Sequence, residues 1–250
     1  MNGTVAGQNY RLGIIGGLGP LASANFCEVL TKLTPVAGDQ DHIPLVMLNV
    51  THTPDRTVAI VESGPSPLPS LSSAIKTLNQ LGVELVVMTC NTAHHWFDEL
   101  SSQSRARMLH IADCTITDIM QRSLGRRIAV LGTEGTVRSG FYQRKLAAAG
   151  YEPIVPSDRL QLEVKSIINY VKSGHLIEAN TAATNIHAHL GELKADAVIL
   201  ACTELPIVWR SRVEAGCLTV PEVNPTVCLA RSTLKALGYE QRMKRTSKSD

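Results

Sequence analysis

Two cysteines occupy equivalent positions in two halves of the chain that resemble each other. Cys90 follows the largely apolar run 83–89, and Cys202 follows the similar run 195–201. A cysteine thiolate is both a good base and a good nucleophile. If the two halves pack face to face, the two thiols lie across one cleft. One sulfur could then take a proton from one face of a carbon atom while the other returns a proton to the opposite face.

A glycine-rich segment that opens each half indicates a duplication. Ile-Ile-Gly-Gly-Leu-Gly surrounds Gly16, and Val-Leu-Gly-Thr-Glu-Gly surrounds Gly132. Gly16 precedes Cys90 by 74 positions, and Gly132 precedes Cys202 by 70. Internal similarity with nearly constant spacing indicates that one structural unit occurs twice.

Both cysteines stand where a helix could begin. Asn-Thr-Ala-His follows Cys90, and Thr-Glu-Leu-Pro follows Cys202. The exposed N–H groups and the dipole at a helix N-terminus stabilise a thiolate, so we expect this placement to lower the pKa of both thiols. Free cysteine is also a common buried residue. That structural role is the one we expect for the remaining cysteines, at positions 27, 114, 217 and 228.

The composition is that of a folded globular protein. With 250 residues, 44% of them hydrophobic, the chain can bury the core of one large domain or of two ordinary ones. The net charge of +2 comes from interspersed acids and bases, which argues against nucleic acid or a membrane surface as a partner. No apolar stretch approaches the ~20 residues of a membrane span, and the polar N-terminus lacks the apolar core of a signal peptide. We therefore expect a cytoplasmic protein whose six cysteines stay reduced.

Strands and helices alternate along the chain, which predicts an α/β fold with a parallel sheet in each half. Strand 83–88 is apolar on both faces, as a strand inside a parallel sheet must be. Helix 71–81 places its large apolar residues on one face, and Ser23 is a candidate N-cap for helix 21–33. The other expected strands are 11–15, 44–50, 127–131, 151–155 and 197–200, and the other expected helices are 140–149, 160–172, 176–190 and 226–237.

Two pseudo-symmetric domains follow from this order of elements. We expect residues 11–110 to form the first domain and residues 111–225 to form the second, so that each carries one of the two cysteines. The last helix, within about 226–240, is expected to cross back to the first domain. Residues 1–10 and 241–250 are expected to be flexible termini. The active site should then lie in the cleft between the domains.

Four predicted strand ends carry small or reactive residues. They are Gly16–Gly19, Cys90, Gly132–Thr136 and Cys202. In open α/β sheets the functional site lies at the carboxyl ends of the strands, so this convergence predicts a single site. The first glycine turn lacks the G-x-G-x-x-G spacing and the lysine of a P-loop, and we interpret it as a tight turn whose amides approach a small anion. Neither Cys-x-x-Cys nor His-x-x-x-His occurs, so a structural zinc site is not supported.

Two cationic residues are candidates for holding a carboxylate. Arg56 follows Pro-Asp in a loop after the second strand, and arginine forms bidentate pairs with carboxylates. It could instead pair with a neighbouring acid on the surface. Lys172 stands near a helix C-terminus, where it could simply interact with the helix dipole. His94 and His95, one helical turn after Cys90, could tune a thiolate or could be packed or solvated.

Five motifs together resemble the aspartate/glutamate racemase family. They are Ile-Gly-Gly-Leu-Gly-Pro (15–20), Pro-Asp-Arg (54–56), Cys-Asn-Thr-Ala-His (90–94), Leu-Gly-Thr-Glu-Gly-Thr (131–136) and Ala-Cys-Thr-Glu-Leu-Pro (201–206). The resemblance extends from about residue 11 to residue 237. It implies a racemase of acidic amino acids that needs neither pyridoxal phosphate nor a metal. It also implies two α/β domains around the substrate, and a homodimer.

The resemblance assigns a role to each matching residue. Cys90 and Cys202 become the general acid/base pair: one thiolate removes the α-proton, the other thiol reprotonates the opposite face, and the roles exchange in the reverse direction. The positions that match donors to the α-carboxylate are Asn91, Thr92, Thr133 and Thr203. Arg56 and Lys172 match the positions that hold the side-chain carboxylate, and Leu18 contributes through its backbone.

Differences from related families indicate which branch of the family this chain resembles. Glutamate racemases open with Asp-Ser-Gly and carry Cys-Thr-His at the second cysteine, whereas this chain has Gly16-Gly17 and Cys202-Thr-Glu. Both differences favour the aspartate-type or broad-specificity branch. Three alternatives remain open: a two-cysteine isomerase of maleate or a hydantoin, a non-catalytic protein that binds an acidic metabolite, and a thiol redox protein. A redox protein needs the two Cα atoms within ~7 Å for a disulfide.

Overall fold

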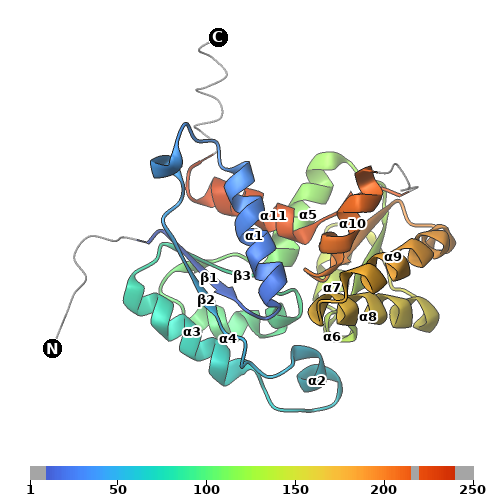
Figure 1. Cartoon of the computed structure of the whole chain (residues 1–250), viewed down its shortest axis with the longest axis horizontal. Helices are drawn as coiled ribbons and strands as arrows, with labels where there is room; N and C mark the ends of the chain where they lie inside the picture. The colour runs from blue at the N-terminus through green and yellow to red at the C-terminus, as the bar shows by residue number, and fades with distance from the viewer. Residues whose placement is uncertain (1–9, 215–219, 240–250) are drawn as a thin grey trace, which may run out of the picture.

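The computed structural model describes residues 10–214 and 220–239, which form two four-stranded sheets. Figure 1 shows the first sheet with helix α3 (Leu68–Leu81) on one side of the molecule and helices α8 (Asp158–Lys172) and α9 (Leu176–Leu190) on the other. Every strand pairing in the described residues is parallel. This confirms the α/β prediction. The termini expected to be flexible lie outside the described residues, except for Tyr10.

The first sheet has the strand order β2-β1-β3-β4. Its strands are β1 (Leu12–Gly16), β2 (Leu45–Asn49), β3 (Leu85–Met88) and β4 (Arg107–Met108). All residues of β1 and β3 are buried. Helices cover both faces of this part of the sheet, which explains why the sequence there is continuously apolar rather than alternating.

The second sheet has the order β6-β5-β7-β8, the same order as the first. Its strands are β5 (Arg127–Gly132), β6 (Glu152–Ile154), β7 (Ala197–Ala201) and β8 (Glu222–Val223). In each sheet the central strand ends in a glycine and the next strand in the sheet leads into a cysteine. The shared order agrees with the duplication that the spacing of glycine and cysteine predicts.

The last helix packs between elements of both halves. Helix α11 (Pro225–Ala236) contacts α1 (Pro20–Leu33) and α5 (Ile111–Arg122), and Figure 1 shows these three helices in the middle of the molecule. One hydrophobic cluster there holds buried residues of both sheets, including Ile14 and Val130. The two halves therefore share a core, and the domain boundaries stated above stay a prediction.

Three local expectations differ from the structure. The segment after Pro54 is a short helix, α2 (Arg56–Val61), whose N-cap Asp55 accepts hydrogen bonds from two backbone N–H groups. The segment 133–136 is the start of helix α6 (Glu134–Ser139), capped by the Thr133 hydroxyl, and α7 (Phe141–Ala148) follows it. Ser23 lies inside α1 and caps nothing. Its hydroxyl instead accepts a hydrogen bond from Gly17 N at 2.9 Å and fixes the glycine turn.

Candidate active site

The carboxyl ends of the central strands of both sheets surround one small pocket, which we call the thiol pocket. All nine residues that we selected from the sequence line it: Leu18, Arg56, Cys90, Asn91, Thr92, Thr133, Lys172, Cys202 and Thr203. Three lining residues were not selected: Asp55, Thr57 and Glu204. Its free volume is about 10 Å³, which is about the space of a single water molecule. An amino acid can therefore bind only if the lining residues move apart.

Cys90 follows β3 and lies two residues before a short 3-10 helix, Thr92–Trp96, that continues into α4 (Phe97–Gln103). Its side chain is 7% exposed. The backbone oxygen of Cys90 lies 2.8 Å from Nδ1 of the buried His94. That histidine is thus a packed residue which fixes the backbone of the cysteine, and its ring stacks on Phe97.

Asn91 and Thr92 bring hydrogen-bonding groups to the pocket from the first half. Asn91 Oδ1 accepts a 2.7 Å hydrogen bond from Tyr142, while its buried Nδ2 has no partner within the described part of the chain. The Thr92 hydroxyl lies 2.9 Å from the hydroxyls of both Thr133 and Thr136. Hydroxyl groups rotate and can donate or accept, so this cluster joins the two halves and offers donors to an anion.

Cys202 follows β7 and is 5% exposed. Its Sγ donates a hydrogen bond to Glu204 Oε2 at 2.9 Å, and Thr203 Oγ1 donates to the same oxygen at 3.2 Å. Burial, reinforced by the negative charge of Glu204, raises the pKa of Cys202 well above its ordinary value, and Lys172 opposes this only in part. The expectation of an acidified thiol is therefore wrong for Cys202. The helix after it begins only at Leu205, and burial outweighs any effect of the helix terminus.

Arg56 has most of its donors engaged by backbone oxygens. Nη2 donates to Leu18 O at 2.6 Å, and Nη1 donates to Thr53 O at 3.2 Å and Pro54 O at 3.1 Å. In the described residues Arg56 does not form the surface ion pair considered above, and it begins helix α2 instead of lying in a loop. A guanidinium carries five N–H groups; the buried Nε has no partner among the described residues. One N–H on Nη2 is also left over. The carbonyls therefore hold the guanidinium in place and leave two of its N–H groups without a partner among the described residues.

Lys172 is the last residue of α8, and its Nζ lies 4.0 Å from Asp55 Oδ2. Burial alone would lower the pKa of Lys172, but the surrounding groups Cys202, Glu204 and Asp55 raise it. For Asp55, burial would raise the pKa, but the N–H of Val58 and the charge of Lys172 lower it. Lys172 therefore stays a cation and Asp55 an anion, and together they border the pocket.

The comparisons with known proteins agree with this geometry. The Asp/Glu/hydantoin racemase model matches residues 15–233. The chain belongs to this family. The broad specificity amino-acid racemase RacX of Bacillus subtilis is 28% identical over 235 residues, which are 92% of this chain and 99% of that protein. The aspartate racemase of Picrophilus torridus superposes with a TM-score of 0.79 at 32% identity, covering 91% of this chain and 94% of that one. An aspartate racemase homologue from Pyrococcus horikoshii, at 24% identity and a TM-score of 0.70, supports the fold.

As a member of this family, the chain is an isomerase, an amino-acid racemase, and the resemblance deduced from the sequence is confirmed. Two of the three residues that the sequence did not select had a signal in the same motifs. Asp55 is the central residue of Pro-Asp-Arg, and Glu204 follows Cys202 by two positions. Within the described ranges, no helix is long and apolar enough to span a membrane. No cluster of three or more metal-ligating side chains is found in those ranges either.

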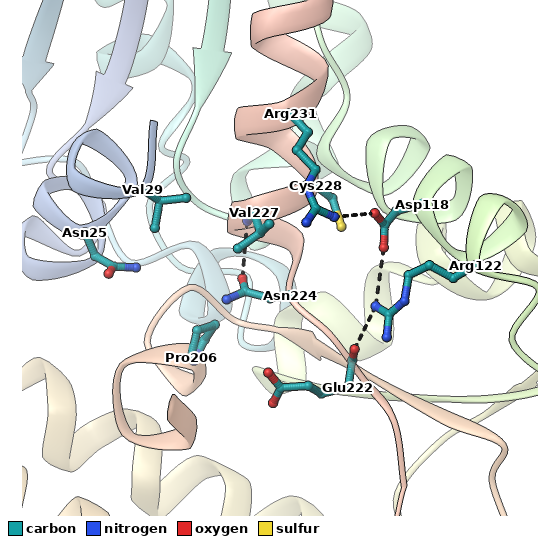
Figure 2. A pocket seen from close by; sticks show the side chains of 10 residues that line it. All are labelled: Asn25, Val29, Asp118, Arg122, Pro206, Glu222, Asn224, Val227, Cys228 and Arg231. Carbon is teal, nitrogen blue, oxygen red and sulfur yellow. Dashed lines mark hydrogen bonds and ion pairs between the residues drawn. The ribbon is translucent and has the colours of Figure 1, made fainter. Parts of the chain in front are cut away.

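The racemase has another pocket, of about 400 Å³, and neither Cys90 nor Cys202 lines it (Figure 2). Asp118 lies on its wall and accepts hydrogen bonds from Arg231 at 3.0 Å and from Arg122 at 3.4 Å. Arg122 also donates to the backbone oxygen of Glu222 at 2.9 Å. These charged groups bond one another and connect α5, α11 and β8, so we interpret them as structural.

Proposed function

We propose that the protein racemises an acidic amino acid, aspartate in the first place, with Cys90 and Cys202 as alternating general base and acid and without a cofactor. The observation that carries the proposal is the thiol pocket itself. Both cysteines line one enclosed space together with Arg56 and Lys172. A purely binding protein has no use for two thiols, and a thiol redox protein has no use for two cations that together match a dianionic substrate.

The proposed chemistry is a proton transfer on each face of the α-carbon. A thiolate on one side takes the α-proton, and the thiol on the other side delivers its proton to the opposite face. A positioned acid or base contributes ~10² to 10⁴ in rate. Negative charge then spreads onto the α-carboxylate, which the hydroxyls and amides of the pocket stabilise. We assign this role to Asn91, Thr92, Thr133 and Thr203, which all line the thiol pocket.

The side-chain carboxylate is assigned to Arg56 and Lys172. The free N–H groups of Arg56 suit an oxygen anion, since a hydrogen bond to a charged group contributes ~1.5–3 kcal/mol. Leu18 supports this role through its backbone oxygen, which holds the guanidinium. Neutral hydantoin rings make no use of these two cations, so the family's acidic substrates are favoured over its ring substrates.

A broader substrate range is the second candidate. A cavity of about 210 Å³ adjoins the thiol pocket and shares Leu18, Asp55, Arg56, Lys172 and Glu204 with it. It gives room for a side chain longer than that of aspartate once the pocket opens, and RacX is a relative of broad specificity. Glutamate is the first such substrate to compare, because its second carboxylate suits the same cations.

Assembly and location are also proposals. The expected homodimer and cytoplasmic location rest on the resemblance to the family. Sedimentation of the purified protein and fractionation of the source cells test them directly.

Proton NMR in D₂O, followed by chiral chromatography, tests the reaction. We expect the α-proton signal of L-aspartate to disappear while D-aspartate forms, with L-glutamate, maleate and a hydantoin run in parallel. Cys90→Ser and Cys202→Ser should each lose at least ~10² of the rate. Cys27→Ser, at a cysteine that does not line the thiol pocket, is the matched control. Turnover that survives in both active-site variants would refute the two-base mechanism.

A further inference from the structure

We propose that Glu204 is a positioning residue that keeps Cys202 as the proton-bearing member of the thiol pair. The inference rests on the proposed function, because it assigns each cysteine its state in the resting enzyme. For the enantiomer whose α-proton faces Cys90, Cys202 is the acid and Cys90 is the base. The carboxylate of Glu204 does not touch the reacting carbon in this assignment and acts only through the sulfur.

The hydrogen bond defines the state of the sulfur. Cys202 Sγ and Glu204 Oε2 lie 2.9 Å apart, and Thr203 donates to the same oxygen. Glu204 is only 3% exposed, so water does not screen the pair. A thiol donates in this geometry, whereas a thiolate would place two negative atoms in contact in a medium of low dielectric constant.

The first half of the chain has no carboxylate at the position that matches Glu204. Thr92 stands two positions after Cys90, where Glu204 stands two positions after Cys202. Its hydroxyl bonds to Thr133 and Thr136 rather than to the sulfur. The two halves therefore differ in charge at the position that controls the thiol.

A glycine makes room for this carboxylate. A methyl group built on Gly19 would overlap Glu204 Oε1. That oxygen is buried and accepts no hydrogen bond from any described residue. An unpaired buried acceptor is costly and calls for an explanation. Contact of Oε1 with Gly19 thus confines the Glu204 side chain, and Oε2 stays against the sulfur of Cys202.

The proton balance of one turnover follows. The proton of the α-carbon moves to Cys90 Sγ, and the proton of Cys202 Sγ moves to the opposite face of the same carbon. The enzyme then holds a Cys90 thiol and a Cys202 thiolate, and exchange of protons with solvent restores the resting state. Because the enantiomers have equal free energy in water, kcat/KM is the same in both directions, so the effect of Glu204 appears in the pH profile and not in a preference between enantiomers.

Several charged groups act on this titration besides Glu204. Those that line the pocket with Cys202 are Lys172, Asp55, Arg56 and Cys90. Lys172 favours the thiolate and opposes Glu204. Glu204→Gln keeps the size of the side chain and removes its charge, so it isolates the contribution of the carboxylate. The basic limb of the kcat/KM profile, which reports loss of the proton from the acid thiol, should move to lower pH by about one unit or more.

A titration of the thiolate absorbance tests the linkage without turnover. Cys90→Ser and Cys90→Ser/Glu204→Gln are compared, so that the difference reports Cys202 alone. The double variant should ionise at lower pH by about one unit or more. If this shift occurs but no amino acid is racemised, the proposed function fails and the role of Glu204 in holding the proton stands. An unchanged titration and an unchanged basic limb would overturn the inference and leave Glu204 a packing residue.

Gly19→Ala provides the second variant. It should displace the carboxylate from the sulfur and shift the basic limb in the same direction as Glu204→Gln. Gly191→Ala, at a glycine with open space around it, is the matched control and should shift nothing. The Gly19→Ala/Glu204→Gln double variant should show no more shift than Glu204→Gln alone, since both act through one contact. Additive shifts would mean that Gly19 acts independently of Glu204, which contradicts the proposed confinement.

Discussion

Acid should destabilise this protein well above the pH at which carboxylates titrate, because of a buried histidine next to the active site. Burial lowers the pKa of His94 from 6.5 to about 4. Its Nδ1 is engaged by the Cys90 backbone oxygen, and its buried Nε2 has no hydrogen-bond partner among the described residues. Backbone groups of Cys90, Leu109 and Asn91 favour the protonated ring, but burial outweighs them. His110, whose ring centroid lies 4.9 Å from that of His94, has its pKa lowered by burial to about 2.

The size and the sign of this loss of folding stability follow from the linkage between proton binding and folding. The unfolded chain protonates His94 below about pH 6.5, whereas the folded chain does so only near pH 4. The stability due to neutral His94 is thus fully present above pH 6.5 and is lost as the pH falls toward 4. The loss is ~3 kcal/mol from a shift of this size at about 1.36 kcal/mol per unit. His110 adds to the loss in the same window, and the two rings titrate as a pair because they are in contact.

Urea unfolding at pH 7, 6, 5 and 4 measures this loss. His94→Asn keeps an amide donor near Nδ1 but cannot be protonated, so it should be less stable at pH 7 and fall less steeply toward pH 4. His95→Asn, at the exposed neighbour, is the control and should follow the wild-type slope. If His94→Asn loses stability with pH as steeply as the wild type does, the acid sensitivity has another origin and the reasoning is refuted.

Two further substitutions test the contacts of the site and of the shared core. Arg56→Lys should lower kcat/KM about 10²-fold, because lysine cannot bond three carbonyls and an anion together; Arg11→Lys, in an exposed pair, should change nothing. Asp118→Asn should lower the free energy of unfolding by ~1 kcal/mol, since its carboxylate is nearly buried but both arginines are partly exposed. Asp113→Asn, which breaks an exposed pair, should cost less than ~0.5 kcal/mol, and equal losses in the two variants would contradict this ranking.

The sequence predicts the sheets and the positions of the thiols because both follow from burial. Strands β1 and β3 are covered on both faces, so their apolar runs are continuous. The end of the β3 run locates Cys90 at the carboxyl edge of the sheet. The edge strands β4 and β8 have two residues each. A segment that short has no hydrophobic period, and neither strand was expected.

Local chemistry that depends on a distant partner was harder to predict. Helix α2 has six residues, and its start depends on the Asp55 cap rather than on an apolar period. The role of Arg56 as a group tied to Leu18 O requires a contact across 38 positions. Likewise, Ser23 is of a residue type that often caps helices. Its hydroxyl instead accepts a hydrogen bond from Gly17 N and lies 2.8 Å from the Thr89 hydroxyl. Composition gives the hydrogen-bonding capacity of a side chain, and only the fold gives its partner.

The pair of thiols shows why a duplicated scaffold must lose its symmetry at one point. Two-base chemistry needs one thiol and one thiolate at the same time. Two sulfurs in identical surroundings would have their ionisations separated only by their mutual repulsion. In the proposed role of Glu204, the carboxylate raises the pKa of the Cys202 thiol, whereas Thr92 at the matching place adds no negative charge beside Cys90. The Glu204→Gln variant should therefore narrow the kcat/KM profile from its basic side.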